Sequence, residues 1–361
     1  MSTLFTATSY GAISVKNRFV MAPMSRNRAT FEGLPTPIMA TYYGQRAGAG
    51  MIVSEGIQPD IQGQGFMNSP GLHSEAQVEA WRAVTAEVKR QGGKMVAQLM
   101  HCGRIGHPSL YPSAHQPLAP SAIKAAGQTF TPSGMADFPV PKAMTDEDIH
   151  AAIQGFATAA ANAIRAGFDG VEIHAGNGFL LHQFMASNTN CREDNYGGSM
   201  ENRLRFTLEV VDAVVKEIGA DRTGIRLSPA NPYNDIVEED TEALYSALVD
   251  ALPELAFVHI MEANVRAITE ILKTKLTSPL ILNPHEHAAD GPVGGEIADK
   301  VLDAALCSGV AFGALFIANP DLVGRIRMNG PLNDLDPNTL YGGDHKGYTD
   351  YPFWQPVKEA V

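Results

Sequence analysis

The sequence has few cysteines, no excess of positive charge and no long apolar run. Its three cysteines, Cys102, Cys191 and Cys307, lack the spacing of metal ligands, so we expect reduced thiols in a cytoplasmic protein. No apolar run is long enough to cross a membrane, and the N-terminus lacks the basic and apolar regions of a secretory signal. The formal net charge of −12 argues against nucleic-acid binding. These absences favour a soluble protein, monomer or homodimer, that acts on a small molecule.

Short apolar segments alternate with helical patterns along the 361 residues, a chain long enough to bury a large core. Strands that alternate with helices predict parallel βαβ units, and this many repeats predicts an α/β fold of the (β/α)8, or TIM barrel, type. The predicted strands are Phe19–Met21, Met51–Glu55, Met95–Met100, Val171–His174, Gly224–Leu227, Phe257–Met261, Leu280–Leu282 and Val310–Phe312. A doubly wound open sheet is the alternative, but no GxGxxG motif follows the first strand.

Helical patterns separate these strands, and no composition shift marks a domain boundary. The predicted helices are Pro37–Ala47, Glu75–Arg90, Asp146–Ala166, Glu201–Ile218, Glu239–Ala251, Val265–Leu276 and Gly295–Leu306. We therefore predict a single TIM-barrel domain over residues 1–361. The segment Leu4–Asn17 resembles a short N-terminal hairpin that could close the bottom of the barrel.

Two segments without a regular period are expected near the barrel mouth. Residues 102–145 are rich in Pro, Gly, Ser and Ala, and their length favours a lid or excursion after the third strand over a plain linker. Residues 341–361 begin with YGGDHKGYTDYPFW, an aromatic and glycine-rich stretch typical of a loop that folds over or near a site.

Polar residues cluster where predicted strands end, and they include Ser25, Glu55, Gln98, His174 and Arg226. In a barrel of this type the active site lies at the C-terminal ends of the strands. The strand that ends at His174 is followed closely by Asn177. Two such donors can hold a carbonyl oxygen and accept negative charge as it develops.

The stretch around this pair reads GVEIHAGNGFLLHQFMASNTNCREDNYGGSMENRLRF, from Gly170 to Phe206. It closely resembles the Old Yellow Enzyme family of FMN-dependent ene-reductases, whose signature is His-x-x-Asn-Gly-Tyr-Leu followed by an Asn-x-Arg-x-Asp-x-Tyr-Gly-Gly-Ser loop. The resemblance covers nearly the whole chain, from NRFVMAPMSR at Asn17 to GYTDYP at Gly347. It implies FMN as cofactor, NAD(P)H as hydride donor and an activated alkene as substrate.

The resemblance also implies which residues contact the flavin. Arg226 would place a positive charge near N1 and O2, Gln98 would bond the pyrimidine edge, and Ser25, where the family usually has Thr, would reach O4. The remaining expected cofactor contacts are Pro23, Met24 and Gly56 beside the ring, and Asn283, Gly313 and Ala314 at the phosphate.

His174 and Asn177 match the family's carbonyl-binding pair, which makes the β-carbon of the substrate electrophilic. Phe179 occupies the position of the family's proton-donating tyrosine, and phenylalanine has no proton to give. General acid catalysis typically contributes about 10²–10⁴-fold, so slower reduction or net isomerisation could follow. Tyr348, in the C-terminal loop, is the alternative proton source that the sequence offers.

The phosphate end departs from the family in two places. Ala314 stands where the family has an arginine, and Asn283–Pro284 replaces a glycine-rich turn. Because Pro284 has no backbone N–H, it cannot donate to a phosphate. We therefore expect weakened phosphate binding, with Gly313 and Ala314 still offering backbone N–H groups.

No metal site is predicted. The sequence His285-Glu286-His287 lacks HExxH spacing, and Ser228 lacks the context of a nucleophile elbow. Three functions remain open: an ene-reductase, an isomerase or other non-redox catalyst that uses the same carbonyl pair, and a flavin-poor binding protein.

Overall fold

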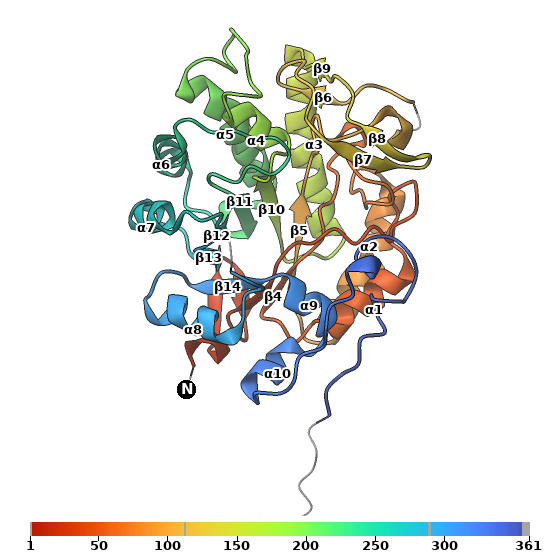
Figure 1. Ribbon diagram of the computed structural model, residues 1–361, viewed down its shortest axis with the longest axis vertical. Helices are drawn as coiled ribbons and strands as arrows, with labels where there is room; N and C mark the ends of the chain where they lie inside the picture. Colours follow the sequence, from red (N-terminus) through yellow and green to blue (C-terminus); the bar gives the residue numbers. More distant parts are fainter. Residues whose placement is uncertain (1, 112, 288–289, 356–361) are drawn as a thin grey trace, which may run out of the picture.

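The computed structural model describes residues 2–111, 113–287 and 290–355, and its centre is a closed barrel of parallel strands surrounded by helices (Figure 1). The order around the barrel is β10–β11–β12–β13–β14–β3–β4–β5. The strands are β3 (Phe19–Met21), β4 (Met51–Val53), β5 (Met95–Leu99), β10 (Gly170–Ala175), β11 (Thr223–Leu227), β12 (Phe257–Met261), β13 (Leu280–Asn283) and β14 (Gly309–Phe312). The predicted TIM barrel is confirmed.

The long helices cover the outside of the barrel, and each corresponds to a predicted one. They are α1 (Pro37–Gln45), α2 (Glu75–Arg90), α3 (Asp146–Arg165), α5 (Met200–Ile218), α6 (Thr241–Ala251), α7 (Arg266–Lys275) and α8 (Gly295–Asp303). Side-chain caps mark the starts of α2, α3 and α5; for example, Ser74 accepts from the Gln77 backbone N–H at the start of α2. The sequence did not predict the short helices α4 (Leu180–Met185), α9 (Ala314–Ala318) and α10 (Leu322–Arg327), which contain too few residues to show a period. Within the described ranges, no helix has the length and apolar character needed to cross a membrane.

The strands bury side chains on both faces, because alternate residues point into the barrel and out toward the helices. On β10, Val171, Ile173 and Ala175 belong to the core between strands and helices. A separate apolar cluster fills the barrel itself: Tyr10, Ile13, Val15, Val20, Ala22, Met51, Val53, Val96, Ala256, Phe257, Ile281 and Ala311. This cluster fills the bottom of the barrel and leaves its C-terminal end to polar side chains.

An antiparallel hairpin, β1 (Thr8–Tyr10) with β2 (Ile13–Val15), contributes to the apolar cluster inside the barrel. The ring of Tyr10 lies 6.1 Å from that of Phe257 in an edge-on arrangement, and its hydroxyl donates to the Ser308 carbonyl oxygen at 3.4 Å. The hairpin therefore closes the end of the barrel opposite the site, as the sequence predicts.

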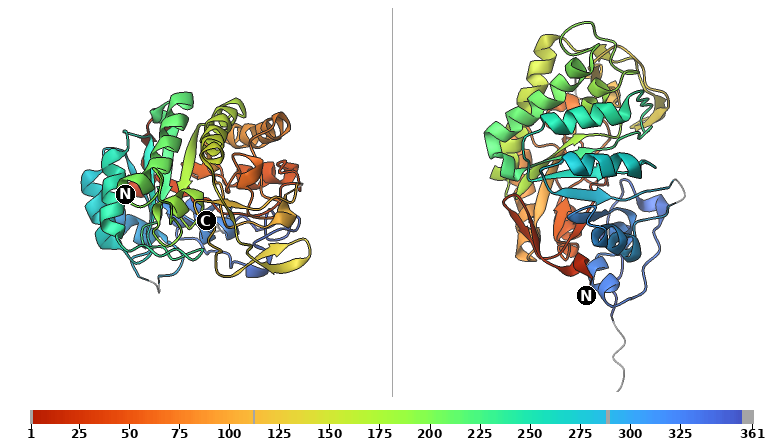
Figure 2. Two further views of the ribbon diagram at one scale, coloured as in Figure 1. Left: turned by 90° about the horizontal axis from the view of Figure 1, so that it is seen from above. Right: turned by 90° about the vertical axis from the view of Figure 1, so that its left-hand side faces the viewer.

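Two further pairs of strands lie in the excursion after β5. The parallel pair β6 (Leu118–Ala119) and β9 (Lys142–Ala143) forms its base, and the antiparallel hairpin β7 (Gln128–Thr131) with β8 (Gly134–Asp137) projects beyond it (Figure 2). Regular hairpin structure thus occupies a segment in which the sequence shows no sustained period. In the C-terminal segment, residues 356–361 lie outside the described residues.

Candidate functional site

A cavity of about 870 Å³ lies at the C-terminal mouth of the barrel. The strand ends contribute Pro23, Ser25, Gly56, Gln98, His174 and Arg226, and the turns after β10 and β11 contribute Asn177, Phe179 and Tyr233. Residues of the β7–β8 hairpin, among them Thr129 and Phe130, form another wall, and Tyr341 and Gly342 come from the C-terminal segment. The excursion and the C-terminal segment therefore both reach the site.

His174 and Asn177 leave β10 toward this cavity. Asn177 adopts a left-handed conformation with φ of 53°, which an asparagine tolerates better than most residues. Its backbone N–H donates to the Ser228 hydroxyl at 2.7 Å, and its carbonyl accepts from the Asn234 side chain at 2.8 Å. The turn is thus fixed on two sides by the loop that follows β11.

Both side chains of this pair hold buried polar atoms that are available to a ligand. His174 Nδ1 and Asn177 Oδ1 have no hydrogen-bond partner within the described part of the chain. Burial and, next, the positive charge of Arg226 lower the pKa of His174 well below its ordinary value. His174 is therefore a neutral imidazole near pH 7, with one N–H to donate and one nitrogen to accept. Buried polar groups are normally paired, so the arrangement indicates a binding site.

The side chain of Arg226 is buried at the end of β11, and its Nε has no partner among the described residues. Burial lowers its pKa, although the Glu172 carboxylate acts in the opposite direction, and an arginine remains charged all the same. A buried guanidinium with a free donor fits the electron-rich edge of a flavin ring. Together with Gln98, Ser25, Pro23 and Gly56 on the same wall, it could hold the ring of FMN.

Two buried residues that sequence reasoning missed lie beneath this wall. Glu172 on β10 accepts a hydrogen bond from the Gln98 amide at 2.8 Å, and its other oxygen lies 2.8 Å from His259 Nδ1 on β12. Glu172 and His259 are fully buried. Since Glu172 takes an amide hydrogen of Gln98, the Gln98 carbonyl oxygen is left to accept from a ligand. A charged residue within an apolar strand, as in GVEIHA, was the available signal.

The opposite side of the barrel offers fewer ligand groups. The Asn283 amide already donates to the Ala311 carbonyl at 3.0 Å, and neither Gly313 nor Ala314 carries a polar side chain. Met24 lies beside Gly313, so these two predicted cofactor residues are neighbours. Met24, Asn283, Gly313 and Ala314 lie outside the set of residues that line the cavity.

Arg266, at the start of α7 before β13, is engaged in ion pairs of its own. It donates to the Glu262 carboxylate at 2.7 and 2.9 Å and to Glu286 at 3.2 Å. Glu262 in turn accepts from the backbone N–H of His285, which fixes the loop after β13. Arg266 is therefore not free to pair with a phosphate here, whereas the backbone N–H groups of Gly313 and Ala314 belong to residues without polar side chains.

Phe179 lies in an apolar wall of the cavity. Its ring centroid is 5.3 Å from that of His174 and 6.2 Å from that of Phe66. The same wall contains Met100, Ile105 and Phe138, with Cys102 and Ala125 buried behind it. A ligand held by His174 would therefore contact a hydrocarbon surface at the position where the family signature has a tyrosine.

Tyr348 does not lie in the cavity. It is fully buried and stacks on Tyr42 with ring centroids 4.0 Å apart, and the Arg28 guanidinium lies 4.2 Å from its ring centroid. Burial raises its pKa well above the ordinary value. The structure therefore does not bring this predicted catalytic tyrosine to the substrate position. The tyrosines that line the cavity are Tyr233 and Tyr341, which sequence reasoning did not single out.

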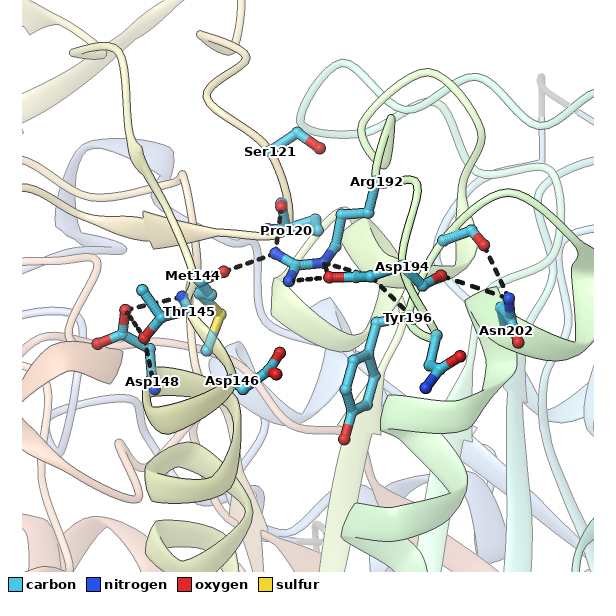
Figure 3. Close-up of polar contacts among 12 residues, drawn as sticks. Pro120, Ser121, Met144, Thr145, Asp146, Asp148, Arg192, Asp194, Tyr196 and Asn202 are labelled. Atoms are coloured by element: carbon cyan, nitrogen blue, oxygen red, sulfur yellow. Dashed lines mark hydrogen bonds and ion pairs between the residues drawn. The ribbon is translucent and has the colours of Figure 1, made fainter.

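The signature loop after α4 supports the excursion rather than the cavity (Figure 3). Arg192 donates to the backbone carbonyls of Pro120 at 3.0 Å and Met144 at 2.6 Å, and it also pairs with Asp194. Pro120 follows β6 and Met144 follows β9, so one guanidinium joins both ends of the excursion. Within the described ranges, no cluster of His, Cys, Asp or Glu has the arrangement of a metal site.

Comparisons with known proteins agree with this geometry. Residues 3–333 match the model of the NADH:flavin oxidoreductase / NADH oxidase family. The chain is 40% identical over 369 residues to putative 12-oxophytodienoate reductase 4 of Oryza sativa subsp. japonica, covering 99% of this chain and 95% of the relative. It is 37% identical over 354 residues to the probable flavin mononucleotide-dependent alkene reductase of Leishmania infantum, covering 95% of each.

Solved structures give the same result. Morphinone reductase superposes with a TM-score of 0.92 at 38% identity, covering 98% of this chain and 96% of that one. The Old Yellow Enzyme homologue from Zymomonas mobilis also gives 0.92 at 38% identity, covering 97% and 99%. The chain therefore belongs to the NADH:flavin oxidoreductase / NADH oxidase family, of the Old Yellow Enzyme type, and is an NAD(P)H-dependent FMN oxidoreductase.

Proposed function

We propose that this protein reduces the C=C bond of α,β-unsaturated carbonyl compounds such as enones, enals and maleimides. The observation that carries the proposal is the pair of polar side chains, His174 and Asn177, on one wall of the cavity. His174 Nδ1 and Asn177 Oδ1 are buried without a partner in the described part of the chain, and the Asn177 amide nitrogen contacts the Met261 sulfur at 3.6 Å. A relative described as a probable alkene reductase supports the same reaction class.

The roles of the two side chains follow from the N–H groups that they carry. The neutral His174 and the Asn177 amide each donate an N–H, and together they hold the carbonyl oxygen of the substrate. As hydride reaches the β-carbon, negative charge moves to that oxygen, and preorganised donors in a buried site stabilise it. FMN, when bound, supplies the hydride that NAD(P)H has given to it.

The proton for the α-carbon must come from a source other than residue 179. The hydrocarbon wall around Phe179 offers no acid. Tyr233 and Tyr341 line the outer cavity and are 57% and 70% exposed, so solvent reaches the site along them. We propose that water protonates the α-carbon and that this step is slow compared with hydride transfer.

The same observation favours isomerisation as a second candidate. If the proton does not arrive, hydride can return from the β-carbon after bond rotation, and the alkene changes geometry without net reduction. This route would use His174 and Asn177 in the same way and would consume no NAD(P)H overall.

One experiment separates these functions. The purified protein is examined by visible absorption and then mixed with NADPH and 2-cyclohexenone under anaerobic conditions. A flavin spectrum with NADPH oxidation that depends on the enone supports the reductase. A flavin spectrum without enone-dependent oxidation, together with cis–trans conversion of an enal, would favour the isomerase. A colourless protein that does not take up added FMN would contradict both.

A further inference from the structure

A buried polar network lies behind the turn that carries Asn177. His182 on α4 and Glu238 in the loop after β11 are paired through Nε2 and Oε1 at 2.6 Å, and both side chains are almost fully excluded from solvent. Glu238 also accepts from the Tyr245 hydroxyl at 2.8 Å, the Ala230 backbone N–H at 2.8 Å and the Thr241 hydroxyl at 3.0 Å.

The other nitrogen of His182 reaches the turn itself. His182 Nδ1 lies 3.0 Å from the backbone nitrogen of Gly178, which donates its N–H to it. Since Nδ1 accepts, the proton of the neutral ring is on Nε2, where it is donated to Glu238. Burial alone would raise the pKa of Glu238, but the hydrogen bonds that it accepts from His182, the Ala230 N–H and the Tyr245 hydroxyl lower it overall. Glu238 is thus an anion that fixes the orientation of the imidazole.

Gly178 is the residue through which this orientation reaches the cavity. It follows Asn177 directly and has φ of 72°, so two consecutive residues are left-handed. A Cβ at Gly178 would meet the Tyr233 carbonyl oxygen at 2.5 Å and Asn234 Cβ at 2.6 Å. The turn is therefore pressed against the loop after β11, and the Gly178 N–H is directed back toward His182.

We infer that His182 is a positioning residue for Asn177: it accepts the Gly178 N–H and so holds the left-handed turn that directs the Asn177 amide at the substrate carbonyl. The inference rests on the proposed role of Asn177. Misplacement of a binding group by about 1 Å can reduce a rate about 10²-fold, so a single hydrogen bond behind the turn matters for function.

Two substitutions separate the hydrogen bonds of His182. In His182→Asn, the amide oxygen replaces Nδ1 as acceptor for Gly178, but the contact with Glu238 is lost. In His182→Gln, the longer amide replaces Nε2 as donor to Glu238, but the acceptor for Gly178 is lost. Because bonds to an ionised group are about twice as strong as neutral ones, His182→Asn should lower the melting temperature more than His182→Gln.

The affinity for a phenolic ligand should follow the opposite order. We expect the FMN-loaded His182→Asn protein to bind 4-chlorophenol within about threefold of wild type, and His182→Gln to bind it about tenfold more weakly, as loss of one hydrogen bond predicts. Isothermal titration calorimetry gives the affinity and calorimetric melting gives the stability. The inference is wrong if His182→Asn binds 4-chlorophenol more weakly than His182→Gln does, or if both variants lose the same affinity. His182 would then have only a structural role.

The Asn177→Ala background gives a second test. If His182 acts through Asn177, His182→Gln should cause no further loss of 4-chlorophenol affinity in that background, and a persisting tenfold loss overturns the inference.

Thr85→Val is the matched control, because it removes a buried 2.6 Å hydrogen bond to the Ala166 carbonyl between α2 and α3. It should lower stability and leave affinity unchanged. If Asn177→Ala alone leaves affinity unchanged, the proposed carbonyl pair is wrong and the inference falls with it; if only His182→Gln has no effect, the inference alone fails.

Discussion

The two sides of the barrel mouth differ in how many polar groups they offer. The side formed by β5, β10 and β11 presents Gln98, His174, Asn177 and Arg226, three of them with buried atoms that have no partner within the described residues. The side formed by β13 and β14 presents Asn283, whose amide is already bonded to the neighbouring strand, and the small residues that follow Phe312.

We propose that this difference separates two tasks within one cofactor site. The polar side would contact the ring and the substrate carbonyl, and the position assigned to the phosphate, Ala314, offers no charged side chain. On this assignment the chain would keep the chemistry of the ring while cofactor retention weakens. The following predictions test that separation, from the largest expected effect to the smallest.

On the polar side, His174→Ala and Asn177→Ala should each slow reduction of 2-cyclohexenone by about 10²-fold, the usual effect of removing one donor from a developing oxyanion. Stopped-flow reoxidation of the reduced protein measures this rate. Tyr341→Phe is the control, because it keeps the ring of an exposed cavity residue and should leave the rate unchanged. Wild-type turnover in either alanine variant would remove that residue from the carbonyl pair.

In the apolar wall, Phe179→Tyr should accelerate reoxidation of the reduced protein by 2-cyclohexenone by about tenfold or more. The new hydroxyl adds a positioned acid to a wall that has none. Flavin reduction by NAD(P)H should change little. Tyr348→Phe provides the comparison: because Tyr348 is buried away from the cavity, this change should leave the rate flat. A flat rate in Phe179→Tyr would mean that the proton does not limit turnover.

On the opposite side, Ala314→Arg should tighten FMN binding by about tenfold or more, because one charge-assisted hydrogen bond is worth about 1.5–3 kcal/mol. Quenching of flavin fluorescence during titration reports the affinity. Ala314→Gln adds similar bulk without charge and should have a much smaller effect. Equal or weaker binding in the arginine variant would contradict the assignment of this position to the phosphate.

The smallest effect concerns the pH dependence of stability. The pKa of His174 is depressed by burial in the folded protein, so below about 6.5 the unfolded chain binds a proton that the folded protein does not. The free energy of unfolding should therefore fall as the pH is lowered from 7.5 to 5.5, by up to about 1.4 kcal/mol, since only about one pH unit of this window lies below the pKa of the unfolded chain. Urea titrations at both pH values should show a smaller difference in His174→Asn. Asn283→Ala, on the opposite side, should keep the wild-type difference.

The barrel could be predicted because apolar residues recur with one period in strands and with another in helices. In an element of sufficient length, this period is visible in the sequence. The Phe257–Met261 strand and the Glu75–Arg90 helix were predicted with the bounds that the structure has. Helix α4, with six residues, has no room for a period, although it carries His182. Some of the predicted cofactor residues at strand ends meet at the cavity. Their meeting could be predicted because chain order fixes which strands are neighbours in a barrel and places their C-terminal ends at one mouth.

The amino-acid sequence by itself determined the alternation of strands and helices, the polar residues at the strand ends, and the replacement of an acid by Phe179. Only the tertiary structure decided which side chains meet. Glu172, His259 and Gln98 come from three strands, and their hydrogen bonds exist only because barrel closure places β5 and β12 around β10 and β11. Tyr348 was excluded from the cavity for the same reason: stacking on Tyr42 and burial beside Arg28 depend on contacts between segments about 300 residues apart.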